Sequence, residues 1–91
     1  MLEISGAIRP AVLRFAIPCD LKQVRLAAET VHQFLTEQQC EEQVLSACDL
    51  VVVEACNNAI KYAPDSAQSM PVLLEVICGE GLVELRVTDH T

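Results

Sequence analysis

The alternation of apolar and polar residues near the start of the chain predicts a strand followed by a helix. In residues 12–19, VLRFAIPC, every second side chain is apolar, which is typical of a half-buried strand that Pro18 ends. Apolar positions then recur at helical spacing over residues 21–38. Asp20 is placed to cap this helix, and Gln23, three positions later, completes a capping-box pattern.

The remainder of the chain predicts a second helix and a pair of strands. The helix covers roughly residues 41–62 and begins with acidic residues, which suit the positive end of the helix dipole. Residues 63–71, rich in Pro, Asp and Ser, are typical of a loop. Two apolar strands follow over 72–78 and 82–89, joined by the glycine-flanked turn GEG.

This order of elements predicts an α+β fold in which both helices pack on one face of a mixed, largely antiparallel sheet. Repeats, low-complexity tracts and linkers are absent from the sequence, so residues 1–91 are expected to form a single domain. Residues 1–10 are poorly patterned and are expected to be irregular or to form an edge segment. Because the sequence ends directly after a strand, at VTDHT, we expect an interrupted fold that is incomplete at its C-terminus.

Composition narrows the class of protein. The chain is 52 % hydrophobic and carries a net charge of −7, without a cluster of basic residues, which argues against binding to nucleic acid. Five cysteines without a C-x-x-C pair or a signal peptide argue against a disulfide framework or a zinc site and favour a reducing cytoplasm. No apolar run approaches the roughly 18–20 residues of a membrane span, so we expect a soluble protein.

The stretch VVVEACNNAIKYA, residues 51–63, places polar side chains among core-like ones. At helical spacing Glu54, Asn58 and Lys61 fall within about 60° of one another. The neighbouring valines spread around the helix, which predicts burial against more than one layer and a need for a partner that offsets the buried carboxylate. An ordinary solvated face is the alternative, and the physics of these residues leaves both interpretations open.

Two motifs resemble those of the GHKL ATPase/kinase superfamily, which has the Bergerat fold. EACNNAIKYA is similar to the N box, a helical Glu followed four positions later by Asn, and VELRVTDHT is similar to the strand that enters the first glycine box. The start LRFAIPCDLKQVRLAAETVHQFL is most similar to anti-sigma factor serine/threonine kinases. The resemblance covers the chain from about residue 12 onward and implies a two-layer Bergerat sandwich. Thr91 departs from the pattern, since the family commonly has a glycine there.

The resemblance implies roles for individual residues. Glu54 matches the general base, and burial would raise its pKa toward the working range. Asn58 matches the asparagine that binds Mg²⁺, and Lys61 matches a position that can reach phosphates. Asn57 is either a supporting partner or an inert neighbour. Asp89 matches the residue that accepts a hydrogen bond from the adenine amine, although an Asp that caps a turn is the simpler interpretation of that residue alone.

Together with the cysteine composition, the resemblance implies a regulatory serine kinase of the cytoplasm that binds Mg-ATP. It would bind a sigma factor and phosphorylate a serine of an anti-sigma antagonist protein, and the resemblance also allows a homodimer. One alternative is the catalytic domain of a histidine kinase, which would normally follow a long pair of dimerisation helices. The other is a non-catalytic module of the same fold that binds nucleotide or protein.

Overall fold

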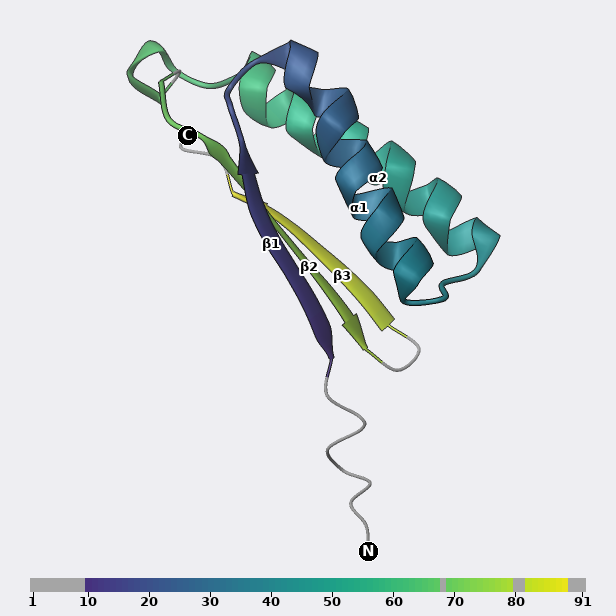
Figure 1. Cartoon of the computed structure of the whole chain (residues 1–91). Coiled ribbons are helices and arrows are strands. Elements are labelled where there is room, and N and C mark those ends of the chain that lie inside the picture. Colours follow the sequence, from purple (N-terminus) through teal and green to yellow (C-terminus); the bar gives the residue numbers. More distant parts are fainter. Residues whose placement is uncertain (1–9, 68, 80–81, 89–91) are drawn as a thin grey trace, which may run out of the picture.

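The computed structural model describes residues 10–67, 69–79 and 82–88 of the 91-residue chain. Its main elements follow the order strand, helix, helix, strand, strand, with both helices on the same side of the sheet (Figure 1). This arrangement confirms the predicted α+β class with helices layered on one sheet face. Of the segment 1–10, only Pro10 belongs to the described residues, so the expectation for that segment lies outside them.

The first strand and the first helix form where the sequence predicts them. Strand β1 is Ala11–Ile17, and its alternate residues Leu13, Phe15 and Ile17 face the core. Asp20 caps the turn that follows, because its side chain accepts a hydrogen bond from the backbone N–H of Lys22 at 3.0 Å.

The predicted capping box does not form. The backbone N–H of Asp20, which a capping box would pair with the Gln23 side chain, donates to the carbonyl oxygen of Pro18 at 2.8 Å instead. The cap therefore opens a short 3₁₀ helix, η2, Leu21–Gln23, and helix α1, Val24–Glu37, continues from it.

A tight connection joins α1 to helix α2, Glu42–Lys61. Gln39 has a φ of 63°, in the left-handed region that commonly terminates helices. The backbone N–H of Cys40 then donates to the carbonyl oxygen of Leu35 at 3.1 Å, which occupies one of the free carbonyls at the end of α1. The two helices consequently pack side by side in opposite directions (Figure 1).

The sheet has the strand order β1-β2-β3, and both neighbouring pairs are antiparallel. Strand β2, Val72–Gly79, lies in the centre, and strand β3, Leu82–Thr88, follows it along the chain. A 3₁₀ helix, η3, Asp65–Ala67, occupies part of the predicted loop between α2 and β2. The register pairs Ile17 with Val72 and Gly79 with Leu82.

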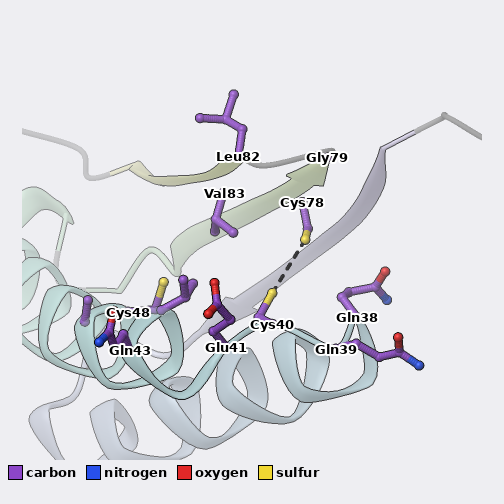
Figure 2. Close-up of a pocket in the computed structure, with 12 residues that line it drawn as sticks. Gln38, Gln39, Cys40, Glu41, Gln43, Cys48, Cys78, Gly79, Leu82 and Val83 are labelled. Carbon is purple, nitrogen blue, oxygen red and sulfur yellow. Dashed lines mark hydrogen bonds between the residues drawn. The ribbon is translucent and has the colours of Figure 1, made fainter.

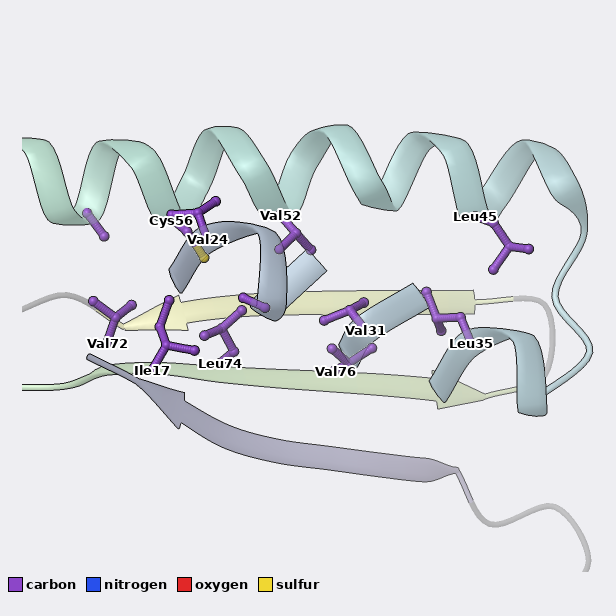
Figure 3. Close-up of a cluster of buried hydrophobic side chains, with 12 residues drawn as sticks. Ile17, Val24, Val31, Leu35, Leu45, Val52, Cys56, Val72, Leu74 and Val76 are labelled. Atoms are coloured by element: carbon purple, nitrogen blue, oxygen red, sulfur yellow. The ribbon is translucent and has the colours of Figure 1, made fainter. Parts of the chain in front are cut away.

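The core lies between the helical layer and one face of the sheet (Figure 3). Leu35 of α1, Val52 of α2 and Val76 of β2 are each fully buried there. Burial of one such aliphatic side chain stabilises a fold by roughly 1.5–3 kcal/mol. The other members of the core are Ile17, Val24, Ala27, Val31, Leu45, Cys56, Ala59, Val72 and Leu74.

The opposite face of the sheet carries a ladder of charges. Glu75 of the central strand pairs with Arg14 of β1 at 2.5 Å and with Arg86 of β3 at 3.3 Å. Arg86 also contacts Glu84 at 2.9 Å. Both arginines are exposed and Glu75 is partly buried, so these pairs contribute little stability, and the ladder indicates a solvated sheet face and not a second core. In the described part of the chain no helix has both the length and the apolar character that crossing a membrane requires.

Candidate functional site

The residues that the sequence assigns to a site gather near the C-terminal end of α2. Glu54, Asn57, Asn58 and Lys61 line one open hollow of about 660 Å³ together with Leu21 of η2. Glu54 and Asn58 lie one helical turn apart, so their side chains project from the same face of α2. The structure therefore brings together the three predicted site residues that α2 carries.

Of the two interpretations that the sequence leaves open for Glu54, the structure contradicts burial and agrees with a solvated face. Glu54, Asn58 and Lys61 are all exposed, and no polar or charged side chain among the described residues is buried. The apolar stretch around Glu54 indicated burial on several sides, but α2 buries only one face, the face that includes Val52 and Cys56. The carboxylate therefore faces solvent, where it does not require a compensating partner.

The exposed face of α2 remains apolar beside the polar cluster. Leu50 is 63 % exposed and Val51 is 50 % exposed, while Val52 next to them is fully buried. Val51 is exposed, Val52 is buried and Val53 is partly buried, because successive residues on a helix point about 100° apart. Glu54 and Asn58 thus project from a helix face that is partly apolar and open to solvent.

Lys61 lies at the last turn of α2 and contacts the following aromatic ring. Its Nζ atom is 5.6 Å from the centroid of the Tyr62 ring, within the range of a cation–π contact. Both side chains are exposed, so this contact is weak and leaves the ammonium group accessible from the hollow. A flexible cation at this position can move toward an anionic ligand.

Asp89 lies outside the described residues, and the structure therefore leaves its role untested. The alternation on which the prediction rests does hold along β3. Val83, Leu85 and Val87 are partly buried and pack against the core, whereas Glu84 and Arg86 are exposed on the other face. Continued by one more step, the same alternation predicts that Asp89 shares the face of Val87.

Sequence reasoning missed a polar contact between the two helices. The Nδ1 atom of His32 in α1 lies 3.1 Å from both carboxylate oxygens of Asp49 in α2. His32 is exposed on α1, and nothing in the spacing of two residues on different helices predicts their contact. Because both partners are exposed, the pair is a modest link between α1 and α2.

The described residues do not form a metal site by themselves. No group of three or more His, Cys, Asp and Glu side chains converges among them in a way that would hold an ion. A single amide such as Asn58 can still contribute one oxygen ligand where phosphate oxygens and water supply the others. The hollow on α2 thus fits a cation that arrives with a phosphate ligand better than a dedicated protein cage.

The chain resembles a known protein family. Residues 17–91 match the family model described as the histidine kinase-like ATPase domain, which confirms the superfamily that the N-box pattern indicates. The match covers most of the chain. It begins at Ile17, the last residue of β1, and includes both helices and the β2–β3 hairpin. Neither the search of curated proteins nor the search of solved structures finds a match. The chain belongs to the family of histidine kinase-like ATPase domains.

Proposed function

We propose that the chain binds ATP together with Mg²⁺ at the hollow lined by Glu54, Asn58 and Lys61. The observation that carries the proposal is the position of Glu54 and Asn58, one turn apart on the same open face of α2. The chain belongs to a family of ATPase domains, which supports ATP as the nucleotide. Lys61 at the end of the same helix adds a positive charge suited to phosphate.

Each residue of the hollow has a separate role in this proposal. The amide oxygen of Asn58 is a hard ligand for Mg²⁺, an ion that usually keeps several waters and takes further oxygens from the phosphates of its substrate. ATP supplies the phosphoryl group that is transferred. Glu54 orients the attacking hydroxyl and accepts its proton, since a carboxylate within hydrogen-bond reach can act as a general base.

We further propose a regulatory serine kinase that binds a sigma factor and phosphorylates a serine of an anti-sigma antagonist protein. The support is the similarity of the β1–η2–α1 sequence to anti-sigma factor kinases, together with the family match. Phosphoryl transfer depends mainly on positioning and electrostatic stabilisation, so an open helix face that presents Glu54 and Asn58 suits it. A histidine kinase catalytic domain is the alternative within the same family.

A non-catalytic module that binds nucleotide or protein is the second candidate, and one observation favours it. Glu54 is exposed, so the described part of the chain does not enclose its carboxylate and exclude water from it. The exposed Leu50 and Val51 beside it are equally suited to contact another protein surface. Turnover separates the two candidates: a kinase transfers phosphate to a serine-bearing partner, and a module only binds.

Calorimetric titration of the full-length protein with ATP, with and without Mg²⁺, tests the proposed binding. We expect affinity for Mg-ATP to exceed affinity for Mg-GTP by roughly tenfold to a hundredfold, since an acceptor at Asp89 meets the amine of adenine but opposes the carbonyl of guanine. Asp89→Ala should weaken ATP binding and remove that preference. Equal affinity for both nucleotides in the wild type would reject the role of Asp89, and lack of any Mg-ATP binding would reject the proposed site.

A further inference from the structure

Two thiols from distant parts of the chain meet at the opposite end of α2. Cys40 lies in the connection between α1 and α2, and Cys78 lies near the end of β2, 38 positions later in the sequence. Their Sγ atoms are 3.8 Å apart, in hydrogen-bond contact, and Figure 2 shows the two side chains pointing toward each other across the gap between the helical layer and the sheet. Both thiols are free.

The backbone on each side holds this pair in place. The N–H of Cys40 is bonded to the carbonyl oxygen of Leu35, whose side chain is fully buried in the core. Cys78 is paired with Ala11 of β1 and with Val83 of β3 in the sheet. The two sulfur atoms thus face each other from fixed positions. To form a disulfide, they need only approach to a bond length of about 2.05 Å, and the strand pairing of Cys78 can stay as it is.

A small reagent can reach the pair. Cys40, Cys48 and Cys78 line an open hollow of about 610 Å³, and all three cysteines are only partly buried. Burial raises the pKa of Cys78, the hydrogen bond with Cys40 raises it further, and the charge of a nearby Cys40 or Cys48 thiolate adds to both effects. The thiol form of Cys78 therefore predominates at neutral pH, and we expect the reaction with peroxide to be slow, because the thiolate is the form that attacks.

We propose that Cys40 and Cys78 are a redox-sensitive pair that a peroxide oxidises to an intramolecular disulfide. In the first step one thiolate attacks a peroxide oxygen, the O–O bond breaks, and a sulfenic acid and hydroxide form. In the second step the other sulfur attacks the sulfenic sulfur, the S–S bond forms, the S–O bond breaks, and water leaves with the proton of the second thiol. Two thiols and one hydrogen peroxide thus give one disulfide and two waters.

The disulfide would join the α1–α2 connection to the central strand. The loop that it closes contains all of α2 and nearly all of β2, so the cross-link restricts the unfolded chain strongly and stabilises the folded one. It lies at the N-terminal end of α2, whereas Glu54 and Asn58 lie toward the C-terminal end. The inference therefore stands independently of the proposed nucleotide site.

Oxidation of the full-length protein with hydrogen peroxide, followed by alkylation and peptide mapping without reductant, tests the inference. We expect the peptides that contain Cys40 and Cys78 to be linked in the wild type and in Cys48→Ser, and unlinked after dithiothreitol. Five free thiols after oxidation, or a link that uses mainly Cys48, would overturn the proposal. The wild-type mapping alone decides this, even if a variant does not fold.

Thermal unfolding gives the second readout. Oxidation should raise the Tm of the wild type and of Cys48→Ser by about 5 °C or more, and dithiothreitol should reverse the rise. Cys40→Ser and Cys78→Ser should show no rise. A Tm that increases equally in these two variants would also overturn the proposal, because the stabilisation would then arise elsewhere.

Discussion

Glu54 and Asn58 lie one turn apart on the exposed face of α2 and line the same open hollow. On that face Leu50 is 63 % exposed and Val51 is 50 % exposed. On the opposite face Val52 and Cys56 are fully buried. α2 therefore performs two tasks, since one face holds the two layers together and the other presents a carboxylate and an amide. Substitutions on the exposed face should change ligand binding without changing the fold.

Asn58→Ala should reduce the affinity for Mg-ATP by more than about 100-fold. Mutation of a residue that only supports a metal ligand typically lowers metal affinity about 10- to 100-fold. Asn58 is proposed to bind the ion directly, so its loss should have a larger effect. Calorimetric titration measures the affinity, and Gln43→Ala, at an exposed amide near the opposite end of α2, is the matched control, with an expected change below about threefold. Unchanged affinity in Asn58→Ala would remove this residue from the site.

Glu54→Gln should preserve Mg-ATP binding and reduce phosphoryl transfer by about 10²- to 10⁴-fold, the usual contribution of a general base. Gln is nearly isosteric with Glu but does not accept a proton. Because Glu54 is exposed, the free energy of unfolding should change by less than about 0.5 kcal/mol. Transfer of labelled phosphate to a serine-bearing partner measures the rate, and wild-type turnover in the variant would show that the carboxylate has no catalytic role.

The fold was predictable because the chain repeats a simple apolar pattern in every element. Alternation in β1 places Leu13 and Phe15 toward the core, and helical spacing places Val24 and Val31 there, as the structure confirms. Such patterns depend only on which side of an element is covered, and a two-layer fold covers one side of each. The failure of the capping box at Asp20 is local, since the preceding Pro18 carbonyl takes the N–H that the motif needs.

The clustering of Glu54, Asn58 and Lys61 on α2 was predictable, but their environment was not. The N-box spacing brings Glu54 and Asn58 together through helix geometry alone, whereas the exposure of Glu54 depends on which layers cover α2. Contacts between side chains of different elements could not be predicted from the sequence for the same reason. The approach of Cys40 to Cys78 is fixed by the strand register and the α1–α2 connection, which apolar patterning does not specify.

Leu35→Ala should destabilise the protein by about 2–5 kcal/mol. The Leu35 side chain is fully buried between α1 and the sheet, so its removal loses apolar burial and leaves a cavity. Leu26 on the same helix is 54 % exposed and is the matched control, because Leu26→Ala removes the same atoms without leaving a cavity. Urea unfolding measures both variants, and Leu26→Ala should change the free energy of unfolding by less than about 0.5 kcal/mol. Equal losses in the two variants would contradict the assignment of Leu35 to the core.

Cys56 should make the stability of the protein decrease at alkaline pH. Burial raises the pKa of its thiol above the ordinary value of 9.0, and the side chain is fully buried between α2 and the sheet. Well below pH 9 the thiol is protonated in both the folded and the unfolded chain, so it causes no pH dependence there. As the pH rises above 9.0, the unfolded chain releases the proton first and is stabilised relative to the folded chain.

This pH dependence can be isolated with Cys56→Ala. At pH 7.5 the wild type should be more stable than the variant, because the variant loses buried volume. Above pH 9 that advantage should shrink by up to about 1.4 kcal/mol per pH unit until the folded thiol also ionises. Urea unfolding with reductant present, at about pH 7.5, 9 and 10, measures the difference across the usual pKa range of a thiol. The control is Cys19→Ala, which changes a partly exposed cysteine. If the wild type and Cys56→Ala lose stability in parallel, the pH dependence does not arise from Cys56, and the buried thiol does not favour the protonated form in the folded chain.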